Sequence, residues 1–485
     1  MGRATTVQER IDMPINPKQR HGASLMPDDQ FHASRRQILA TMLTGLLIGG
    51  GIAGGGRMSA AAMPNSTKLF TPRGAGDQDG RDWRNAMGLK SLSKALGSAR
   101  PGSAFMIGFD PGAGESFPLD ASQVRLAASG SPDDPIQVQA GLISGTDDLA
   151  AAARGEGPAL FRSSRGWSLA NFGKRKSSCY LAVTNGASHI RLSGFRVDGT
   201  GADGFVKFRA KQDQPQTFED IVISRIDATN VGRIVESDKG ATLRNVIIED
   251  CRAVGIVRGF ARFRTLTDSV LRKLDLDADH MDAGGRNVCQ LIALSAGENI
   301  VFEDVVLRNA VNDPRKSGKK EGYVQGDGIV CERGTRNVTL RRCHGSGMGD
   351  SAFDIKATDA TIEDSSTDSC KYGARLWSDS NNVIRRCDFR NPQSSGKIKG
   401  ACIEASGRLE VIDTKLQAGP GTVAIKLQQP KKGKDPVVHM RGGSIQLDGD
   451  AEIALANGAG VLELHQVAVN GVTTDHRYVF EKKKQ

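Results

Sequence analysis

The sequence predicts an all-β fold, a right-handed parallel β-helix (a solenoid of stacked coils) with an N-terminal helical cap. Two observations predict it: one short apolar frame returns eight times, and aromatic residues make up only 5% of the 485 residues. The frame starts are Ile190, Ile221, Val246, Ser269, Ile300, Val338, Ala360 and Asn382. Apolar and polar residues alternate inside each frame, as in strands. Irregular steps above about 22 residues indicate coils that carry loops of different length.

In such a coil the inward apolar residues stack on their counterparts about 4.8 Å away, and outward residues are free to vary. The narrow core explains the few aromatic residues. Cys251, Cys343 and Cys387 share one inward position of the frame. Cys343 and Cys387 are two coils apart, roughly 9–10 Å, which is beyond disulfide reach. They are interpreted as core residues, while other cysteines of an exported chain could still pair.

Residues 1–63 are interpreted as a twin-arginine export signal. Arg35 and Arg36 precede an apolar, glycine-rich run, and the small residues of 59–63 follow it. We therefore expect a periplasmic or secreted protein that meets the twin-arginine export machinery transiently, after folding. An uncleaved membrane anchor is the alternative.

The remaining chain is divided into three parts. Residues 64–130 do not repeat and are expected to form the cap, with a helix whose apolar face carries Met87, Leu89, Leu92 and Leu96. The helix would cover the open end of the stack. Residues 131–475 form the predicted β-helix, and 476–485 a basic C-terminal tail.

Outward residues of the strands after each turn form two predicted columns. One contains Val330, Asp354, Arg375 and Cys402, and the other contains Glu332, Lys356, Trp377 and Glu404. Asp327, Asp350 and Tyr372 occupy the turns that lead into these strands. A mixture of both charge signs with aromatic residues on one face predicts a catalytic or sugar-binding site. The alternative is an ion ladder in which Asp354 pairs with Arg375 and Glu332 with Lys356.

Two further segments are candidates for binding. The basic loop 311–323 carries Arg315, Lys316 and Lys319, which would suit a polyanion, although a solvated insertion is an equal alternative. The net charge of +10 favours anionic partners in the same way. No cofactor is required by the predicted site, but one aspartate-rich segment could hold Ca²⁺. Its residues are Asp275, Asp277, Asp279 and Asp282, with no glutamate to close a calcium loop.

The coil frame over about 130–470, with the helical cap before it, resembles the pectate-lyase-like β-helix superfamily. Polygalacturonases of that superfamily carry Asn-Thr-Asp-Gly, Gly-Asp-Asp and Gly-His-Gly on successive coils. Here Asp327 and Asp350 match two of those acids, while Ser351 and Tyr372 replace the third acid and the histidine. The alginate-lyase branch implies a Lys base with an Arg one coil later, as Lys356 and Arg375 could be, often with Ca²⁺.

We expect a monomeric protein with an acidic polysaccharide, and no nucleic acid, as its partner. The first hypothesis is β-elimination, in which Lys356 removes the proton α to a uronate carboxyl, Arg375 neutralises that carboxyl and Tyr372 protonates the leaving oxygen. The second is hydrolysis by Asp327 and Asp350, with Asp354. Uronate C5-epimerisation shares the proton abstraction. A non-catalytic polysaccharide-binding or export-assisting protein is the last alternative.

Overall fold

The computed structural model describes residues 67–109, 117–118, 124–142, 161–162, 179–198, 204–281, 288–312, 324–430 and 433–482. The predicted export signal, Arg315, Lys316, Lys319 and Asp282 lie outside the described residues. Within the described part of the chain, no helix has both the length and the apolar character needed to cross a membrane.

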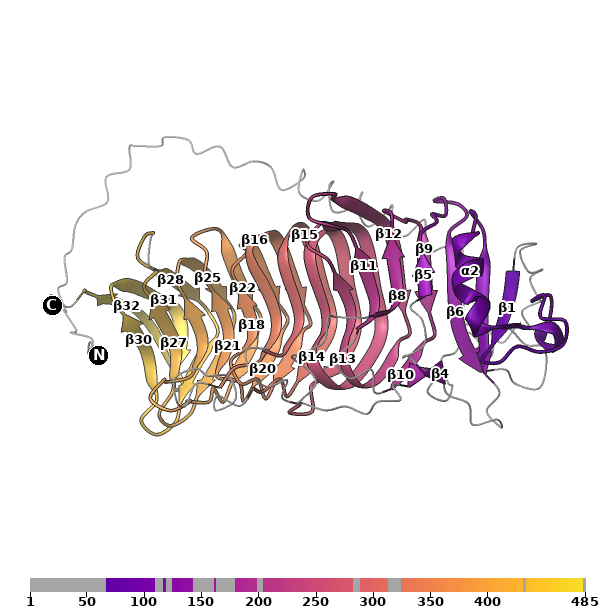
Figure 1. Cartoon of the computed structure of the whole chain (residues 1–485). Coiled ribbons are helices and arrows are strands. Elements are labelled where there is room, and N and C mark those ends of the chain that lie inside the picture. Colours follow the sequence, from indigo (N-terminus) through magenta and orange to yellow (C-terminus); the bar gives the residue numbers. More distant parts are fainter. Residues whose placement is uncertain are drawn as a thin grey trace, which may run out of the picture. The chain divides into compact units, whose positions relative to one another are not determined.

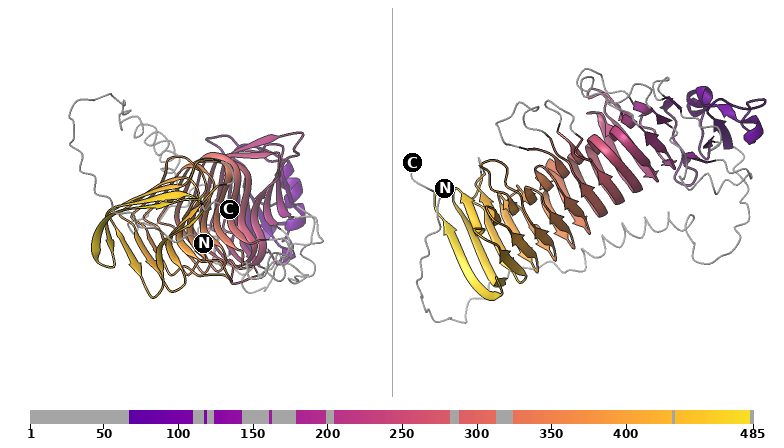
Figure 2. Two further views of the ribbon diagram at one scale, coloured as in Figure 1. Left: turned by 90° about the vertical axis from the view of Figure 1, so that its left-hand side faces the viewer. Right: turned by 90° about the horizontal axis from the view of Figure 1, so that it is seen from below.

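The described residues from Thr67 onward form a parallel β-helix, which confirms the predicted fold (Figure 1). Successive coils lie side by side along one axis in both further views (Figure 2). Three parallel ladders run along the stack, and residues from neighbouring coils pair in register. The alternating apolar residues fill one continuous core between the ladders.

The first ladder carries the repeated frame. Ile190, Ile221 and Val246 pair in turn, as do Ser269, Ile300 and Val338, and the ladder continues through Ala360 and Asn382. Its strands are β1 (Thr67–Thr71), β3 (Ala104–Phe109), β6 (Ile136–Leu142), β9 (Ile190–Ser193), β12 (Gln216–Ser224), β14 (Ala241–Asp277), β15 (Gln290–Arg308), β16 (Asp327–Arg341), β19 (Thr358–Glu363), β22 (Asn382–Arg385), β25 (Arg408–Ile412), β28 (Val437–Arg441) and β31 (Gly460–Val469).

The long strands β14, β15, β16 and β31 bend at the corners, so each contributes to more than one ladder. The second ladder adds β4 (Phe117–Pro118), β7 (Phe161–Arg162), β10 (Arg196–Asp198), β13 (Asp227–Ser237), β17 (His344–Ser346), β20 (Ser366–Asp368), β23 (Asp388–Arg390), β26 (Lys415–Ala418) and β29 (Ser444–Leu447). The third adds β5 (Val124–Leu126), β8 (Cys179–Thr184), β11 (Gly204–Arg209), β18 (Ser351–Ile355), β21 (Tyr372–Leu376), β24 (Ala401–Ala405), β27 (Val423–Gln428) and β30 (Glu452–Asn457), and it shares β13 with the second.

The two ends of the stack differ from the predicted boundaries. The expected single helix is broken into η1 (Trp83–Asn85), η2 (Leu89–Ser91) and α2 (Leu92–Gly97), because β2 (Met87–Gly88) pairs with β1. Strands β1 and β3 already belong to the first ladder, so coils begin before residue 131. At the other end β32 (Val472–Phe480) pairs antiparallel with β31, so residues 476–480 are a strand and not a tail.

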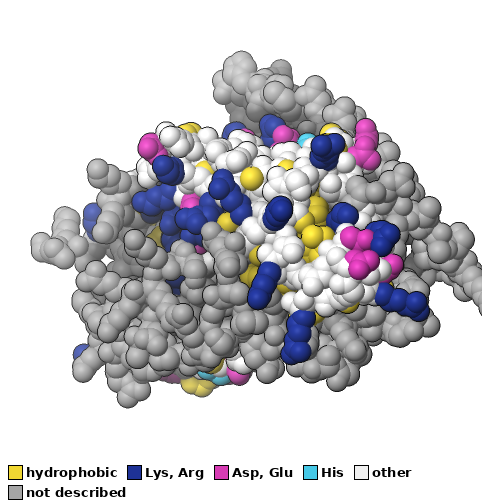
Figure 3. Space-filling model, turned by 45° about the vertical axis from the view of Figure 1, so that its right-hand side comes forward, with side chains coloured by type: hydrophobic (Ala, Val, Ile, Leu, Met, Phe, Trp, Pro, Cys, Tyr) yellow, Lys and Arg dark blue, Asp and Glu magenta, His cyan; other side chains and the backbone are white. Residues whose placement is uncertain are grey.

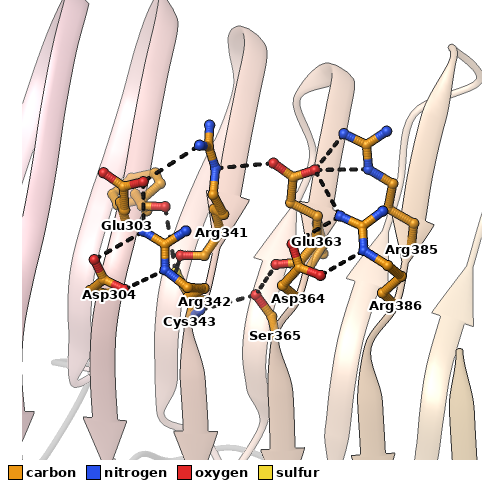
Figure 4. A network of polar contacts seen from close by, with 12 residues as sticks. Glu303, Asp304, Arg341, Arg342, Cys343, Glu363, Asp364, Ser365, Arg385 and Arg386 are labelled. Atoms are coloured by element: carbon orange, nitrogen blue, oxygen red, sulfur yellow. Dashed lines mark hydrogen bonds and ion pairs between the residues drawn. The ribbon is translucent and has the colours of Figure 1, made fainter.

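Charged side chains alternate in sign from coil to coil at the corner that ends the first ladder (Figure 4). The corner residues, all in the left-handed region, are Arg225, Asp250, Lys273, Asp304, Arg342, Asp364, Arg386 and Asp413. Nε of Arg342 lies 2.6 Å from Oδ1 of Asp304, and Nε of Arg386 lies 2.7 Å from Oδ1 of Asp364. The repeated frame therefore varies in its charged residues because each coil presents the charge opposite to that of its neighbours.

All eight cysteines are buried and none forms a disulfide. Cys343 and Cys387 lie in the core cluster as the frame predicts, and their thiols point toward backbone carbonyl groups of the same or the preceding coil. The interpretation of Cys251, Cys343 and Cys387 as core residues is confirmed.

Candidate active site

The third ladder brings most of the predicted site residues together on one outer face. Val330, Asp354 and Arg375 pair in register there, as predicted, and the column continues through Glu404 and Lys426. The predicted fourth position is wrong, because Cys402 belongs to the core and Glu404 stands opposite Arg375. The step from Arg375 to Glu404 is 29 residues. A longer loop follows β23, so the residue that pairs with Arg375 on the next coil cannot be found by counting one repeat length.

Three aspartates form the centre of the site, and each is nearly buried. Asp327, Asp350 and Asp354 are 6%, 5% and 6% exposed. Asp327 begins β16, Asp350 precedes β18 and Asp354 lies within it. Gly326 places Asp327: its φ is 130°, and a Cβ there would lie 2.0 Å from the carbonyl oxygen of Ala310. Only glycine fits that backbone position.

The pKa of Asp327 lies well above the usual range of a carboxyl group. Burial raises its pKa to about 8, and the charges of Asp350 and Asp354 raise it further than burial alone would. Its Oδ1 accepts a hydrogen bond of 3.2 Å from the amide of Ser351. Within the described part of the chain, no cation forms an ion pair with it. A carboxyl group held neutral beside two other carboxyl groups can act as a proton donor.

Cations surround the other carboxylates. Nζ of Lys371 and Nη1 of Arg375 each lie 3.3 Å from an oxygen of Asp350. Arg375 also contacts Glu404 at 2.8 Å through Nη2, and Nζ of Lys426 lies 2.8 Å from the other Glu404 oxygen. Burial lowers the pKa of Lys371, and the charge of Arg375 adds to this effect. The site is thus an alternating chain of buried charges.

Two aromatic rings lie against the guanidinium group of Arg375. Its central carbon lies 4.6 Å from the ring centroid of Tyr372 and 4.4 Å from that of Trp377. The indole N–H of Trp377 donates to Oδ1 of Asp354 at 2.5 Å. Burial raises the pKa of Tyr372, with the charge of Glu404 adding to it, and its hydroxyl accepts a hydrogen bond of 2.9 Å from Lys426. The rings hold Arg375 in place, so Trp377 has one face occupied already.

Lys356 lacks the property that the elimination hypothesis requires. Its Nζ lies 2.8 Å from Glu332 and 3.3 Å from Asp354. Burial acts to lower its pKa, but the charges of Asp354 and Glu332 outweigh burial and the pKa is raised. A lysine that acts as a base needs a lowered pKa. The ion-ladder alternative is correct for Lys356 and Glu332, whereas Arg375 pairs with Asp350 and Glu404.

Sequence reasoning missed Lys371 and Lys426 and misplaced Glu404. Lys426 could have been found, because Val-Ala-Ile-Lys-Leu (423–427) repeats the strand pattern of the site on the next coil. Lys371 gave no signal, since it occupies a turn ahead of β21. The ends of the basic loop do border the site. Asn312 and Gln325 form a bridge, and Lys371 donates a hydrogen bond of 3.4 Å to the carbonyl of Val324.

A cationic cluster lies on the same ladder toward the N-terminus and consists of Lys207, Arg233, Arg258, Arg262 and Arg264. Lys207, Glu236 and Arg262 occupy the column that later contains Asp354. Burial lowers the pKa of Arg233 to about 9, Glu236 opposes this, and the charges of Arg258 and Arg262 lower it further. The pKa of Arg262 is lowered too, by burial and then by Arg264. Lys and Arg side chains gather densely on part of the described surface (Figure 3).

The aspartates predicted to hold calcium are engaged by protein groups. Asp275 and Asp277 both pair with Arg308, the latter at 3.2 Å. Oδ1 of Asp277 accepts hydrogen bonds of 2.7 Å from the amide of Asp279 and 3.0 Å from Asn309. Burial acts to raise the pKa of Asp277, but these hydrogen bonds outweigh it and the pKa is lowered. A calcium ion would have to displace Arg308, so these residues are better explained as a corner network.

No family model and no curated protein matches the sequence. Solved structures match at low identity. An alginate lyase from Paenibacillus sp. has 14% identity and a TM-score of 0.38, covering 73% of this chain and 97% of its own. An exopolygalacturonase from Thermotoga maritima has 12% identity and a TM-score of 0.36, covering 82% and 89%. A surface adhesin of Streptococcus pneumoniae, PfbA, has 12% identity and a TM-score of 0.40, covering 83% of this chain and 90% of its own.

Proposed function

We propose that the protein is a glycoside hydrolase that cleaves an acidic polysaccharide, with Asp327 as the general acid. The observation that carries the proposal is the cluster of nearly buried carboxyl groups, in which, among the described residues, Asp350 is ion-paired with Lys371 and Arg375 whereas Asp327 is not, and burial raises the pKa of Asp327 to about 8. Glycoside hydrolysis uses two carboxyl groups, one protonated and one ionised, and environments that differ in this way assign the two roles.

In the proposed reaction Asp327 donates its proton to the glycosidic oxygen as the bond from that oxygen to the anomeric carbon breaks. The carboxylate of Asp350 accepts a proton from a water molecule, whose oxygen forms the new bond to the anomeric carbon. Lys371 and Arg375 pair with Asp350 and fix its position. Asp354, fixed by Trp377 and Lys356, adds negative charge that would stabilise the oxocarbenium-like transition state.

The cationic cluster supports an acidic polymer as the substrate. Arg262 lies three coils from Asp354 in the same column, about 14 Å along the stack. Burial and the neighbouring Arg264 disfavour the charged form of Arg262 and lower its pKa. A uronate carboxylate bound there would compensate that charge, so a polymer lying along the ladder would contact the cations and the acids together.

β-Elimination is the second candidate, with Lys371 as the base in place of Lys356. The observation that favours it is the lowered pKa of Lys371, which lies beside Arg375. Lys371 is 1% exposed, so substrate would have to reach a side chain that is more deeply buried than Asp327. We therefore rank elimination second.

The test is incubation of the purified protein with polygalacturonate, alginate and a neutral glucan, followed by mass spectrometry of the products. Hydrolysis adds the mass of water to each pair of fragments, whereas elimination gives unsaturated products that absorb ultraviolet light. We expect hydrolysis of a uronate polymer and its loss in Asp327→Asn. Asp359→Asn is the matched control, because Asp359 is exposed and lies at a corner with φ of 56°, which Asn adopts readily. Unsaturated products, or no product from any polymer, would contradict the proposal.

A further inference from the structure

A group of metal-binding side chains lies at the C-terminal end of the first ladder, away from the candidate active site. His439 is in β28, and Glu463 and His465 are in β31. The parallel register places His439 directly opposite Glu463. Glu463 and His465 are two residues apart on one strand, so they point to the same face. All three side chains are partly exposed, at 29%, 24% and 52%.

The donor atoms of these side chains converge. One nitrogen of each histidine and one carboxylate oxygen lie within 4.8 Å of one another. Nδ1 of His439 lies 2.9 Å from Oε2 of Glu463, and Nε2 of His465 lies 3.7 Å from the same oxygen. Ligands at about 2.0–2.1 Å from a tetrahedral Zn²⁺ are roughly 3.3–3.5 Å apart, which falls between these two distances.

We propose that His439, Glu463 and His465 form a site for a divalent transition-metal ion, Zn²⁺ in particular. Two imidazoles and one carboxylate are the ligand types that Zn²⁺ takes, with the fourth position left for water. Hard cations such as Ca²⁺ and Mg²⁺ prefer sets of oxygen ligands and would bind poorly here. The site does not depend on the proposed hydrolysis, because none of its residues takes part in the proposed reaction.

One cation competes with the metal. Nε of Arg477, in β32, lies 3.1 Å from Oε1 of Glu463. This contact orients the carboxylate so that Oε2 faces the two histidines. It also places a positive charge near the ion, which weakens binding. Arg477 therefore weakens the binding of any divalent cation, and its removal should tighten the binding of Zn²⁺.

A bound ion would link the last coils of the stack. His439 and the other two ligands come from neighbouring strands of the first ladder, next to the antiparallel strand β32 that ends it. An ion that binds only the folded chain raises the free energy of unfolding by mass action. Zn²⁺ should therefore raise the melting temperature as well as bind.

The test uses the full chain without a histidine tag, titrated with ZnCl₂ in a calorimeter after treatment with a chelator. We expect one Zn²⁺ per chain at this site, at least tenfold weaker binding in His439→Gln and in His465→Gln, and tighter binding in Arg477→Gln. CaCl₂ should give no comparable heat. His344→Gln is the matched control, since His344 is an exposed histidine that bonds to Ser366 on the second ladder.

The melting temperatures of the variants without metal show whether each is folded. Glu463→Gln offers a conservative second variant, which keeps the shape of the side chain and removes its charge. Equal Zn²⁺ affinity in the wild type, His439→Gln and His465→Gln would overturn the proposal, as would the absence of binding at micromolar protein. This test is independent of the proposed hydrolysis: a protein that cleaves no polysaccharide should still bind Zn²⁺ in the same way.

Discussion

Arg375 contacts a single oxygen of Glu404 twice across one coil of the third ladder, through a hydrogen bond of 2.9 Å from Nε and an ion pair of 2.8 Å from Nη2. Both side chains are nearly buried. The contact fixes the plane of the guanidinium group, which in turn holds Asp350 and lies against the rings of Tyr372 and Trp377. Glu404 is therefore a positioning residue for the charged face, acting through Arg375.

Glu404→Gln should destabilise the protein by about 3–5 kcal/mol, because it removes the counter-charge of Lys426 and one of the two counter-charges of Arg375, both nearly buried cations. Urea denaturation measures the free energy of unfolding. The control is Glu410→Gln, which breaks a more exposed pair with Arg441 and should cost less than about 1 kcal/mol. Equal effects of the two changes would contradict the assigned role of Glu404.

The stability contributed by Glu404 should depend on pH. Burial acts to raise its pKa, but Arg375 and Lys426 outweigh burial and the pKa is lowered. An acid whose folded pKa is lowered contributes stability above its unfolded pKa of about 4.3, and loses it as the pH falls through the folded value. The difference in melting temperature between wild type and Glu404→Gln should therefore shrink in acid. A constant difference from neutral pH down to strong acid would argue against this.

The raised pKa of Asp327 should change stability with pH in the direction opposite to that of Glu404. The folded pKa of Asp327, about 8, lies above its unfolded value, so the folded chain binds more protons between the two. Its contribution makes the protein less stable as the pH rises from about 4 to about 8. Asp327→Asn should remove that part of the slope, which melting temperatures across the range would measure. In the wild type, hydrolysis should decline above about pH 8 as the general acid loses its proton.

Reversing one corner charge should destabilise the stack through repulsion with both neighbouring coils. In Arg342→Glu the new carboxylate faces Glu303 and Asp304, which Arg342 now contacts at 2.7 and 2.6 Å. We expect a loss of about 1–2 kcal/mol in low salt, since several exposed pairs of up to about 1 kcal/mol are replaced by repulsion. The loss should shrink in 1 M NaCl, where charges are screened over about 3 Å. Arg342→Gln, which adds no charge, should cost less.

The thiol groups should be unreactive in the folded protein. Burial raises the pKa of Cys343, Cys370 and Cys402 to about 12, and all eight cysteines are buried. A thiol reagent such as 5,5′-dithiobis(2-nitrobenzoate) should therefore label none of them before unfolding and all eight in denaturant. Fast labelling of the native chain would show that part of the stack opens readily.

The fold could be predicted from the sequence because its information is local and repeated. The eight frame starts share one ladder, since each frame repeats the same inward residues and the stack allows only one register for them. The site was predictable only as far as the repeat stays regular. The predicted column is correct at Asp354 and Arg375. It is wrong at the next position, which Glu404 occupies, because a longer loop follows β23.

The roles of the site residues could not be read from the sequence. Lys356 and Lys371 are both lysines near Asp354 or Asp350, yet their pKa values shift in opposite directions. The difference depends on burial and on which carboxylates each side chain reaches. The pKa of Asp327 depends likewise on Asp350 and Asp354, which follow it in the chain but adjoin it only in the folded stack.

The alternation of charge along the corner has a consequence for how such a chain can lengthen. Acidic and basic corners take turns from Arg225 to Asp413. Duplicating a single unit within this region would set two corners of the same sign against each other, whereas duplicating two adjacent units would preserve the order. Evolution would then tolerate the insertion of an even number of coils more readily than the insertion of an odd number, because only an even number preserves the alternation of charge at the corner.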